Sequence, residues 1–280
     1  MLETPLSAAA LIPALVFATS PVTDAPEFKG PSITDFFPPA IFFEGSEFFE
    51  LNRIMLLRLL IVAILVLLFW LGTRKMSIVP GRFQGTIELG LDFVRVGIAE
   101  NLLGEKDGKR FLPLITTMFF LVLFMNLTGI VPGINISANA VIGMPLVLAV
   151  AAYIAFIYAG LRKHPWAFLR NALFPPGVPP ILYIIVTPIE FISMFILRPV
   201  TLTLRLLMNM IVGHLLLVLF FSATAFFMVD LGGWWIGASL VTLAFGTAFS
   251  FFEVLVAVLQ AYVFALLTAV YIQLALADEH

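Results

Sequence analysis

Between Phe111 and Leu161 the chain has no charged residue, and this run limits the possible folds more than any other feature. About 20 consecutive apolar residues suffice for one transmembrane helix, so the run is too long for one crossing and suits two. The stretch VPGINISANA at 131–140 contains Pro132 and Gly133 and supplies the break. We therefore predict membrane spans over about 111–131 and 141–160.

The composition of the whole chain agrees with a membrane protein. It is 61% hydrophobic and 11% charged, with a mean hydropathy of +1.09, whereas soluble domains are about 45–50% apolar and about 25% charged. The chain has no cysteine, which excludes a disulfide framework and a thiolate metal site. The formal net charge of −2 argues against a nucleic-acid partner.

A first span is predicted over about 54–72. Arg58 lies one turn inside it, and its long side chain is expected to extend to the lipid headgroups.

The last third of the chain predicts two long apolar helices, over about 181–222 and 238–276, separated by VDLGGWW at 229–235. At 1.5 Å per residue each is far longer than the hydrocarbon core of about 30 Å. Each must therefore tilt strongly or lie partly along the membrane plane, or else contain a bend or break. Pro188 and Pro199 could kink the first.

Between Gln84 and Leu103, polar residues recur at helical spacing among apolar ones. This pattern is typical of an amphipathic helix lying in the membrane interface, and a helix packed on a partner subunit would look the same. The predicted fold is an all-α integral membrane protein with about five membrane helices and one amphipathic interfacial helix. The two long, strongly tilted C-terminal helices are expected to form a hairpin.

The loops predict the orientation, because cytoplasmic loops are enriched in Lys and Arg. Residues 73–110 hold seven such residues and 161–180 hold three, whereas 132–140 and 223–237 hold none. We expect a multi-pass protein of the cell membrane with the N-terminus outside and the C-terminus in the cytoplasm.

The N-terminal stretch 8–19, AAALIPALVFAT, resembles a signal-peptide core but lacks a positive region before it, so cleavage is not expected. The chain then divides into an extracytoplasmic segment (1–50), a part with the first membrane helix and the amphipathic helix (51–110), a part with the second and third membrane helices (111–180), and the long hairpin (181–280).

Several polar residues lie inside the predicted membrane helices, where a charge costs at least about 2.5–3.5 kcal/mol. Arg205 is the clearest case, because arginine stays protonated at any accessible pH and supplies a fixed positive charge. Asn209 follows one turn later on the same face. The others are Glu190 and His214 on the same long helix, and Glu253 and Gln260, two turns apart, on the last helix.

Glu and His titrate, and Asn and Gln can order water, so this set predicts a proton path interrupted by a fixed positive charge. The alternatives are a structural ion pair of Arg205 with Glu190 or Glu253, and a packing role for His214. Asn209 and Gln260 could equally form hydrogen bonds between helices. One His and one Glu are too few to predict a metal site, and no cofactor is expected.

Four motifs carry a family resemblance: FMNLTGIVPG at 124–133, PIEFIS at 188–193, RPVTLTLRLLMNMIVGHLLL at 198–217 and LQAYVFALLTAVYIQLALADEH at 259–280. Together and in this order they resemble subunit a of F-type ATP synthases. The resemblance covers the chain from about residue 75 to the end. It implies a non-catalytic stator subunit with two offset proton half-channels, whose tilted helical hairpin faces a rotating ring of c subunits. It also implies the b subunits of the peripheral stalk and the remaining ATP synthase subunits as partners, with protons as the transported ion.

The resemblance places the essential arginine of the family on Arg205, its neighbouring asparagine on Asn209 and the glutamine of the last helix on Gln260. The titratable pair of the outer half-channel falls on His214 and Glu253, with acid and histidine exchanged between the two helices relative to some members.

A glutamate of the cytoplasmic half-channel falls on Glu190. In many members that glutamate lies eight residues before the proline of the RP motif, whereas Glu190 lies nine before Pro199, so a helix bulge is needed to keep its facing. Where many members have LFGN, this chain reads LLMN, with the bulkier Met208.

Three other functions fit the composition less well. An autonomous transporter would be expected to show internal repeats, and the two halves of the chain show none. A structural scaffold would hold Arg205 in an ion pair. An intramembrane enzyme would need a nucleophile–base pair or a metal cluster, and the sequence offers neither.

Overall fold

The computed structural model describes residues 28, 30–32, 40–42, 51–74, 76–131, 137–163, 168, 174, 179 and 182–277. Within them, five helical segments are long and apolar enough to cross a membrane: Arg53–Thr73, Arg82–Leu127, Gly143–Lys163, Tyr183–Leu231 and Gly233–Leu276. The prediction of an all-α membrane protein with five membrane helices is confirmed. The stretch 8–19 lies outside the described residues.

Helix α1 (Arg53–Thr73) follows two short strands, β1 (Ala40–Phe42) and β2 (Leu51–Asn52), which pair antiparallel. The side chain of Asn52 caps the helix by accepting a hydrogen bond from the backbone N–H of Met55 at 2.9 Å. One face of α1 is buried, through Ile54, Leu57, Ile61 and Leu65 at intervals of three and four residues. The remaining faces are apolar and exposed, as expected for a helix in contact with lipid.

Arg58 differs from its prediction. Its Nε donates to the backbone oxygen of Ala138 at 2.9 Å, and its Nη2 donates to that of Val141 at 3.3 Å. The guanidinium therefore attaches α1 to the segment before the next helix rather than extending to headgroups, because two free carbonyl oxygens lie within its reach.

Helix α2 (Arg82–Val94), the π-helical segment η2 (Arg95–Glu100) and helix α3 (Asn101–Leu127) follow each other directly. Gly104, with φ +75°, breaks the run, a conformation that glycine adopts without strain. The predicted amphipathic helix forms, but part of its apolar face packs inside the chain, since Val94, Ile98 and Ala99 are fully buried. Leu89 and Val96 stay exposed, and an interfacial position for them stays a prediction.

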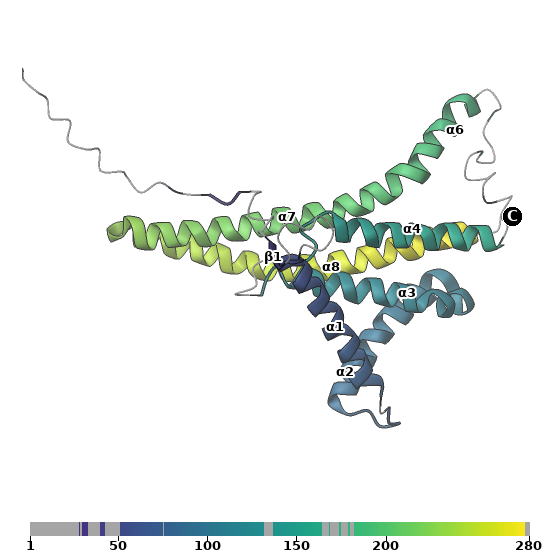
Figure 1. Ribbon diagram of the computed structural model, residues 1–280, viewed down its shortest axis with the longest axis horizontal. Coiled ribbons are helices and arrows are strands. Elements are labelled where there is room, and N and C mark those ends of the chain that lie inside the picture. The colour runs from purple at the N-terminus through teal and green to yellow at the C-terminus, as the bar shows by residue number, and fades with distance from the viewer. Residues whose placement is uncertain are drawn as a thin grey trace, which may run out of the picture.

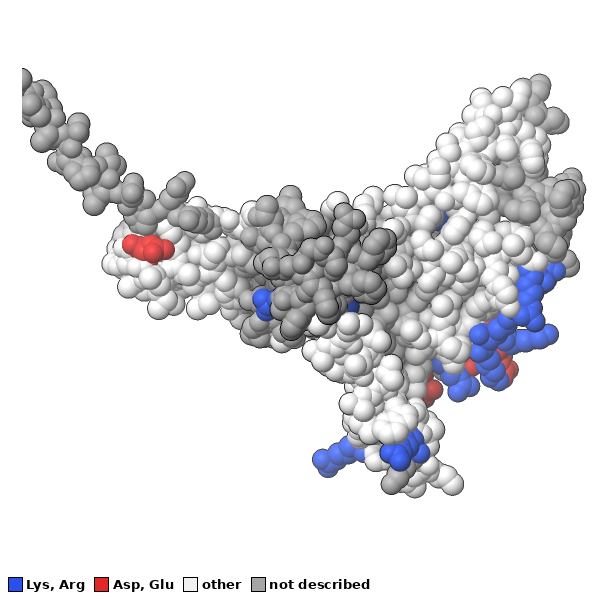
Figure 2. Space-filling model, viewed as in Figure 1, with Lys and Arg blue, Asp and Glu red and all other residues white. Residues whose placement is uncertain are grey.

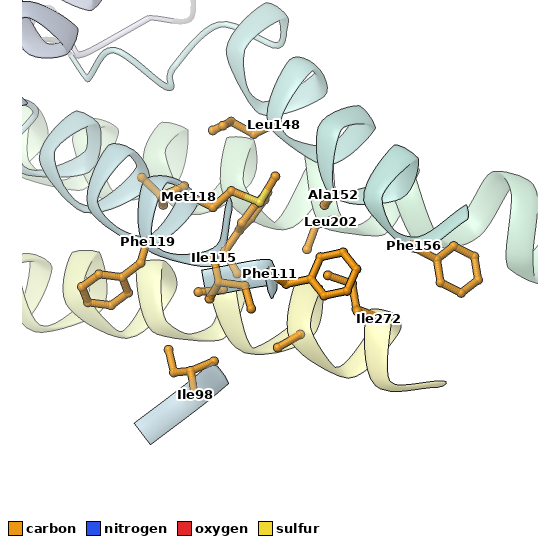
Figure 3. Close-up of a cluster of buried hydrophobic side chains, with 14 of the residues drawn as sticks. Ile98, Phe111, Ile115, Met118, Phe119, Leu148, Ala152, Phe156, Leu202 and Ile272 are labelled. Carbon is orange, nitrogen blue, oxygen red and sulfur yellow. The ribbon is translucent and has the colours of Figure 1, made fainter. Parts of the chain in front are cut away.

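Helix α8 (Ile236–Leu276) lies at the centre of the molecule, with α3 on one side and α4 (Gly143–Lys163) on the other (Figure 1). Ala257, Ala261, Ala265 and Ala269 recur every four residues along α8 and are all fully buried. Small residues at this spacing let neighbouring helices approach closely, which is the main source of packing between helices in lipid. Around them the larger side chains Phe111, Ile115, Phe156 and Ile272, labelled in Figure 3, fill the core.

The segment before α8 consists of α6 (Tyr183–Ile192), the π-helical segment η4 (Ser193–Leu197), α7 (Arg198–Ala225) and the π-helical segment η5 (Phe226–Leu231). The chain then turns through Gly232 and Gly233, both with positive φ, into the 3₁₀ turn η6 (Gly233–Trp235) and α8. Figure 1 shows α6 diverging from the line of α7 and α8. Of the two overlong helices, the first thus contains two π-helical segments and the second is α-helical throughout. Their tilt in the membrane stays a prediction.

Candidate functional site

Helices α7 and α8 pack in one constant antiparallel register. The hydroxyl oxygens of Thr224 and Thr242 lie 2.8 Å apart. Gly246 lies four residues after Thr242 on α8, and Phe220 lies four residues before Thr224 on α7. A Cβ on Gly246 would lie 3.2 Å from the Cβ of Phe220. Seven residues beyond Gly246 on α8, Glu253 lies against Gly213, which is seven residues before Phe220 on α7. These three contacts set the level of every polar residue on the two helices.

Glu253 is buried on α8 with its carboxyl group against the backbone of α7. A Cβ on Gly213 would lie 2.7 Å from Oε1 of Glu253, so the absence of a side chain at Gly213 makes room for the carboxyl group. His214 is the next residue on α7 and is also buried. The structure therefore brings the two predicted titratable residues to the same level of the helix pair.

Gln260 is buried on the same face of α8, two turns beyond Glu253. In the register of the two helices it lies opposite Leu206, the neighbour of Arg205 on α7. Asn209 is half-buried one turn beyond Arg205. The amide nitrogens of Asn209 and Gln260 and Oε2 of Glu253 are buried and have no hydrogen-bond partner among the described residues. Such groups require a water or a partner molecule, because an unsatisfied buried polar atom costs about 1–3 kcal/mol.

Arg205 is exposed on the side of α7 that faces away from the core. The surface around it is mostly apolar, and Leu204, Met208 and Val212 are exposed there. Met208 therefore points away from α8, and its bulk does not separate the two helices. In the described part of the chain, no carboxylate forms an ion pair with Arg205, so the alternative of a structural ion pair with Glu190 or Glu253 is not what the structure has.

Glu190 is half-buried on α6, on the other side of Arg205 from His214 along the helix. The π-helical segment η4 lies between Glu190 and the RP motif, at the place where the sequence requires a bulge. A π-helical turn absorbs one extra residue without breaking the helix. The extra residue before Pro199 is accommodated in this way. The structure does not bring Glu190 near the pair His214 and Glu253.

The sequence did not identify Gly213 or Arg198 as contributors. The guanidinium carbon of Arg198 lies 5.2 Å from the ring centre of Phe156 on α4 and 5.3 Å from that of Tyr271 on α8. Arg198 thus holds the first turn of α7 against two neighbouring helices. The signal for Gly213 was present, since a glycine inside an apolar helix next to a polar residue often marks a close approach; the two aromatic partners of Arg198 are too distant in the sequence to be inferred.

In chemical terms, the arrangement has titratable groups at two levels along the helices and a fixed positive charge between them. At about 1.5 Å per residue, His214 lies about 14 Å from Arg205 along the axis, and Glu190 lies about 22 Å from it in the opposite direction. Within the described residues, no group of three or more His, Asp or Glu side chains could hold a metal ion. Such an arrangement can exchange protons at each of the two levels, with the fixed positive charge separating them.

Comparisons with known proteins give a consistent result. A family model described as ATP synthase A chain matches residues 55–273. The chain is 53% identical over 258 residues to ATP synthase subunit a of Rhodococcus erythropolis (strain PR4 / NBRC 100887), covering 91% of this chain and 94% of that protein. It is 39% identical over 262 residues to the protein of the same name from Pseudarthrobacter chlorophenolicus, covering 93% and 98%. It is 34% identical over 261 residues to ATP synthase subunit a of Streptomyces lividans, covering 92% of each chain.

Proposed function

This chain belongs to the ATP synthase subunit a family, and on that basis we propose that Arg205 separates two proton half-channels that lead to the carboxylates of a rotating c-ring. The chain is a non-catalytic, proton-translocating membrane subunit of the ATP synthase. The observation that carries the proposal is the exposure of Arg205, without an ion pair among the described residues, on an apolar face of α7. A charge in that position needs a carboxylate from a partner.

The outer half-channel begins on the side of His214 and Glu253. A proton passes these two residues and neutralises a carboxylate on the ring. The neutral site can then enter the lipid, because the cost of exposing a charge to hydrocarbon is removed. The buried amide nitrogen of Gln260, which has no hydrogen-bond partner among the described residues, supports this path, since it offers a donor for water between Glu253 and the level of Arg205.

After nearly a full turn of the ring, the carboxylate reaches the second half-channel and releases its proton past Glu190 to the cytoplasm. Arg205 favours the ionised carboxylate, as an opposite charge within a few ångströms does. Because arginine does not give up its own proton, it also prevents direct passage from one half-channel to the other. Asn209, one turn away, is in position to orient the arginine or the ring carboxylate. The driving force is about 2.3 kcal/mol per charge per 100 mV, plus the pH gradient.

The partners in this proposal are the c-ring on the exposed face around Arg205, the b subunits of the peripheral stalk and the remaining subunits. The protein lies in the cell membrane with its N-terminus outside and its C-terminus in the cytoplasm. The distribution of Lys and Arg supports that orientation, since 73–110 holds seven of them and 223–237 holds none.

The test uses membrane vesicles from cells that carry Arg205→Ala, Arg82→Ala or the unchanged chain, with equal amounts of assembled complex. Arg82 is also an exposed arginine but lies at the start of α2. ATP-driven proton uptake is followed with a pH-sensitive dye. We expect uptake in the unchanged chain and in Arg82→Ala, and none in Arg205→Ala, although its catalytic head hydrolyses ATP once released. Normal uptake in Arg205→Ala would mean that the arginine is structural and that the proton path is elsewhere.

A further inference from the structure

Two arginines from different helices converge on one oxygen atom at the end of the molecule where α3 begins and α4 ends. Nη2 of Arg110 on α3 donates to the phenol oxygen of Tyr158 at 3.0 Å, and Nη1 of Arg162 on α4 donates to the same oxygen at 2.6 Å. Their guanidinium carbons lie 5.3 and 5.9 Å from the centre of the Tyr158 ring. The proposed proton path does not use these residues.

The two arginines share a neutral acceptor, and neither forms an ion pair within the described part of the chain. The ion pairs there join Arg95 to Glu100 and Lys109 to Glu105, and neither involves Arg110 or Arg162. Two like charges held this close repel each other, and more strongly in a medium less polar than water. Both side chains are exposed, so an anion from outside the chain can reach them.

Guanidinium groups suit one kind of anion in particular. Their planar donor pairs match the oxygens of a phosphate group, and two of them can hold one phosphate from two sides. Figure 2 shows Lys and Arg gathered at this end of the molecule. Lys163, beside Arg162, donates to the backbone oxygen of Leu276 at the end of α8, which keeps the ends of α4 and α8 together. The local charge thus favours a phosphate over a neutral ligand.

An apolar stripe leads from the two arginines along α4 into the membrane. Its members recur at intervals of three and four residues, so they share one face, and all are exposed: Val147, Val150, Ile154, Tyr158 and Leu161. At 1.5 Å per residue the stripe is about 21 Å long. It therefore exceeds one leaflet of hydrocarbon, which is about half of 30 Å.

From these observations, we propose that Arg110 and Arg162 bind the phosphate headgroup of an anionic phospholipid whose acyl chain lies along the Val147–Leu161 stripe of α4. A free phosphate ion would use the arginines but not the stripe, and a protein helix would not need the phosphate-binding geometry. The distribution of Lys and Arg predicts that the end of the molecule with Arg110 and Arg162 lies in the cytoplasm. Anionic lipids of the cytoplasmic leaflet attract basic residues there.

The experiment uses the whole ATP synthase complex, purified in neutral detergent and freed of bound lipid. The probes are phosphatidylglycerol and phosphatidylcholine with a photoreactive group in the acyl chain, added separately. Labelled positions on α4 are located by peptide mass spectrometry. Competition with unmodified phosphatidylglycerol and with inorganic phosphate distinguishes a lipid site from a site for a small anion.

Three variants give the comparison. R110Q/R162Q removes the arginine pair. R74Q/R82Q removes the same amount of charge elsewhere, at the end of α1 and the start of α2. Y158F removes the shared oxygen but keeps both arginines. All are compared at equal content of this subunit and equal ATP hydrolysis, and if R110Q/R162Q does not assemble, the single variant R162Q replaces it.

We expect phosphatidylglycerol to label the stripe more strongly than phosphatidylcholine, by a factor on the order of ten. Unmodified phosphatidylglycerol should compete and inorganic phosphate should not. R110Q/R162Q should lower the labelling to the phosphatidylcholine level, whereas R74Q/R82Q and Y158F should not. Equal labelling by the two lipids, or unchanged labelling in R110Q/R162Q, would overturn the proposal. Competition by inorganic phosphate would also overturn it in favour of a small-anion site, and a stripe that neither lipid labels would mean that another subunit covers it.

Discussion

Gly213 on α7 and Glu253 on α8 are in direct contact, and a Cβ on Gly213 would lie 2.7 Å from Oε1 of the glutamate. The carboxyl group can occupy this place only because residue 213 has no side chain. The contact positions Glu253 at the level of His214 and belongs to the register in which Thr224 meets Thr242.

Gly213→Ala should displace the carboxyl group of Glu253 while the helices stay packed, because the atom it meets is the end of a flexible side chain. A catalytic group displaced by about 1 Å can lose up to about a hundredfold in rate, so we expect ATP-driven proton uptake to fall on the order of tenfold. Gly237→Ala is the matched control, since a Cβ on Gly237 meets nothing within 4 Å. Equal uptake in the two variants would show that the contact does not matter for transport.

Glu253→Gln keeps the shape of the side chain and removes its ability to exchange a proton. If Glu253 relays protons, uptake in vesicles should fall at least about tenfold, in line with the loss of other acid–base groups. The control is Glu105→Gln, which removes an exposed carboxylate that pairs with Lys109. Retained uptake in Glu253→Gln would assign Glu253 a packing role.

The register can be tested by cross-linking, because the natural chain has no cysteine. A Cβ on Gly246 would lie 3.2 Å from the Cβ of Phe220, close to the 3.5–4.5 Å range of disulfides. F220C/G246C should therefore form an intramolecular disulfide under mild oxidation. F220C/T247C, one residue out of register, should form little, and mass spectrometry of peptides separates the two outcomes. Preferential cross-linking of the second pair would contradict the helix pairing described here.

Arg198→Gln should loosen the first turn of α7, because it removes the cation that lies close to the rings of both Phe156 and Tyr271. Each cation–π contact contributes about 0.5–2 kcal/mol, so thermal dissociation of the membrane sector should begin at a lower temperature. Arg198→Lys should recover only part of the loss, since a compact ammonium group does not stack on aromatic rings as a planar guanidinium does. Equal temperatures of thermal dissociation for Arg198→Gln and the unchanged chain would show that the contacts of Arg198 with the two rings do not stabilise the membrane sector.

Deletion of Ile196 should convert the π-helical segment η4 to α-helix and keep the facing of α6 relative to α7, because it removes the one extra residue that the π-helical segment absorbs. Glu190 would then keep its direction, and we expect proton uptake to stay near normal. Ile196→Ala shortens the same side chain without changing the register and should leave uptake near normal. A large loss of uptake after the deletion, with normal uptake in Ile196→Ala, would show that η4 does more than absorb an extra residue.

Much of this architecture could be predicted from the order of residues alone. The spans around 54–72, 141–160 and 238–276 follow from apolar runs of sufficient length, and the turn at Gly232 and Gly233 follows from VDLGGWW. The need for a bulge after Glu190 could be inferred from one extra residue before Pro199, and a π-helical segment lies there. The roles of Arg205, His214 and Glu253 in proton translocation remain predictions.

Other features could not be read from the chain. The hydrogen bonds of Arg58, the rings around Arg198 and the contact of Gly213 with Glu253 all join residues that are far apart in the sequence. The amphipathic segment before Gly104 illustrates the same limit, because its pattern did not show that Ile98 would be buried inside the chain itself.

The physical reason lies in the solvent. Hydrocarbon accepts any sufficiently apolar helix, so length and charge along the sequence decide which segments cross the membrane and where the polar residues lie on them. Lipid is as apolar as leucine, however, and gives helices no hydrophobic reason to prefer one face of a neighbour over another. Which faces meet is decided by the close fit of small residues, such as Ala261 and Gly213, against side chains far away in the sequence. That fit exists only once the helices are packed.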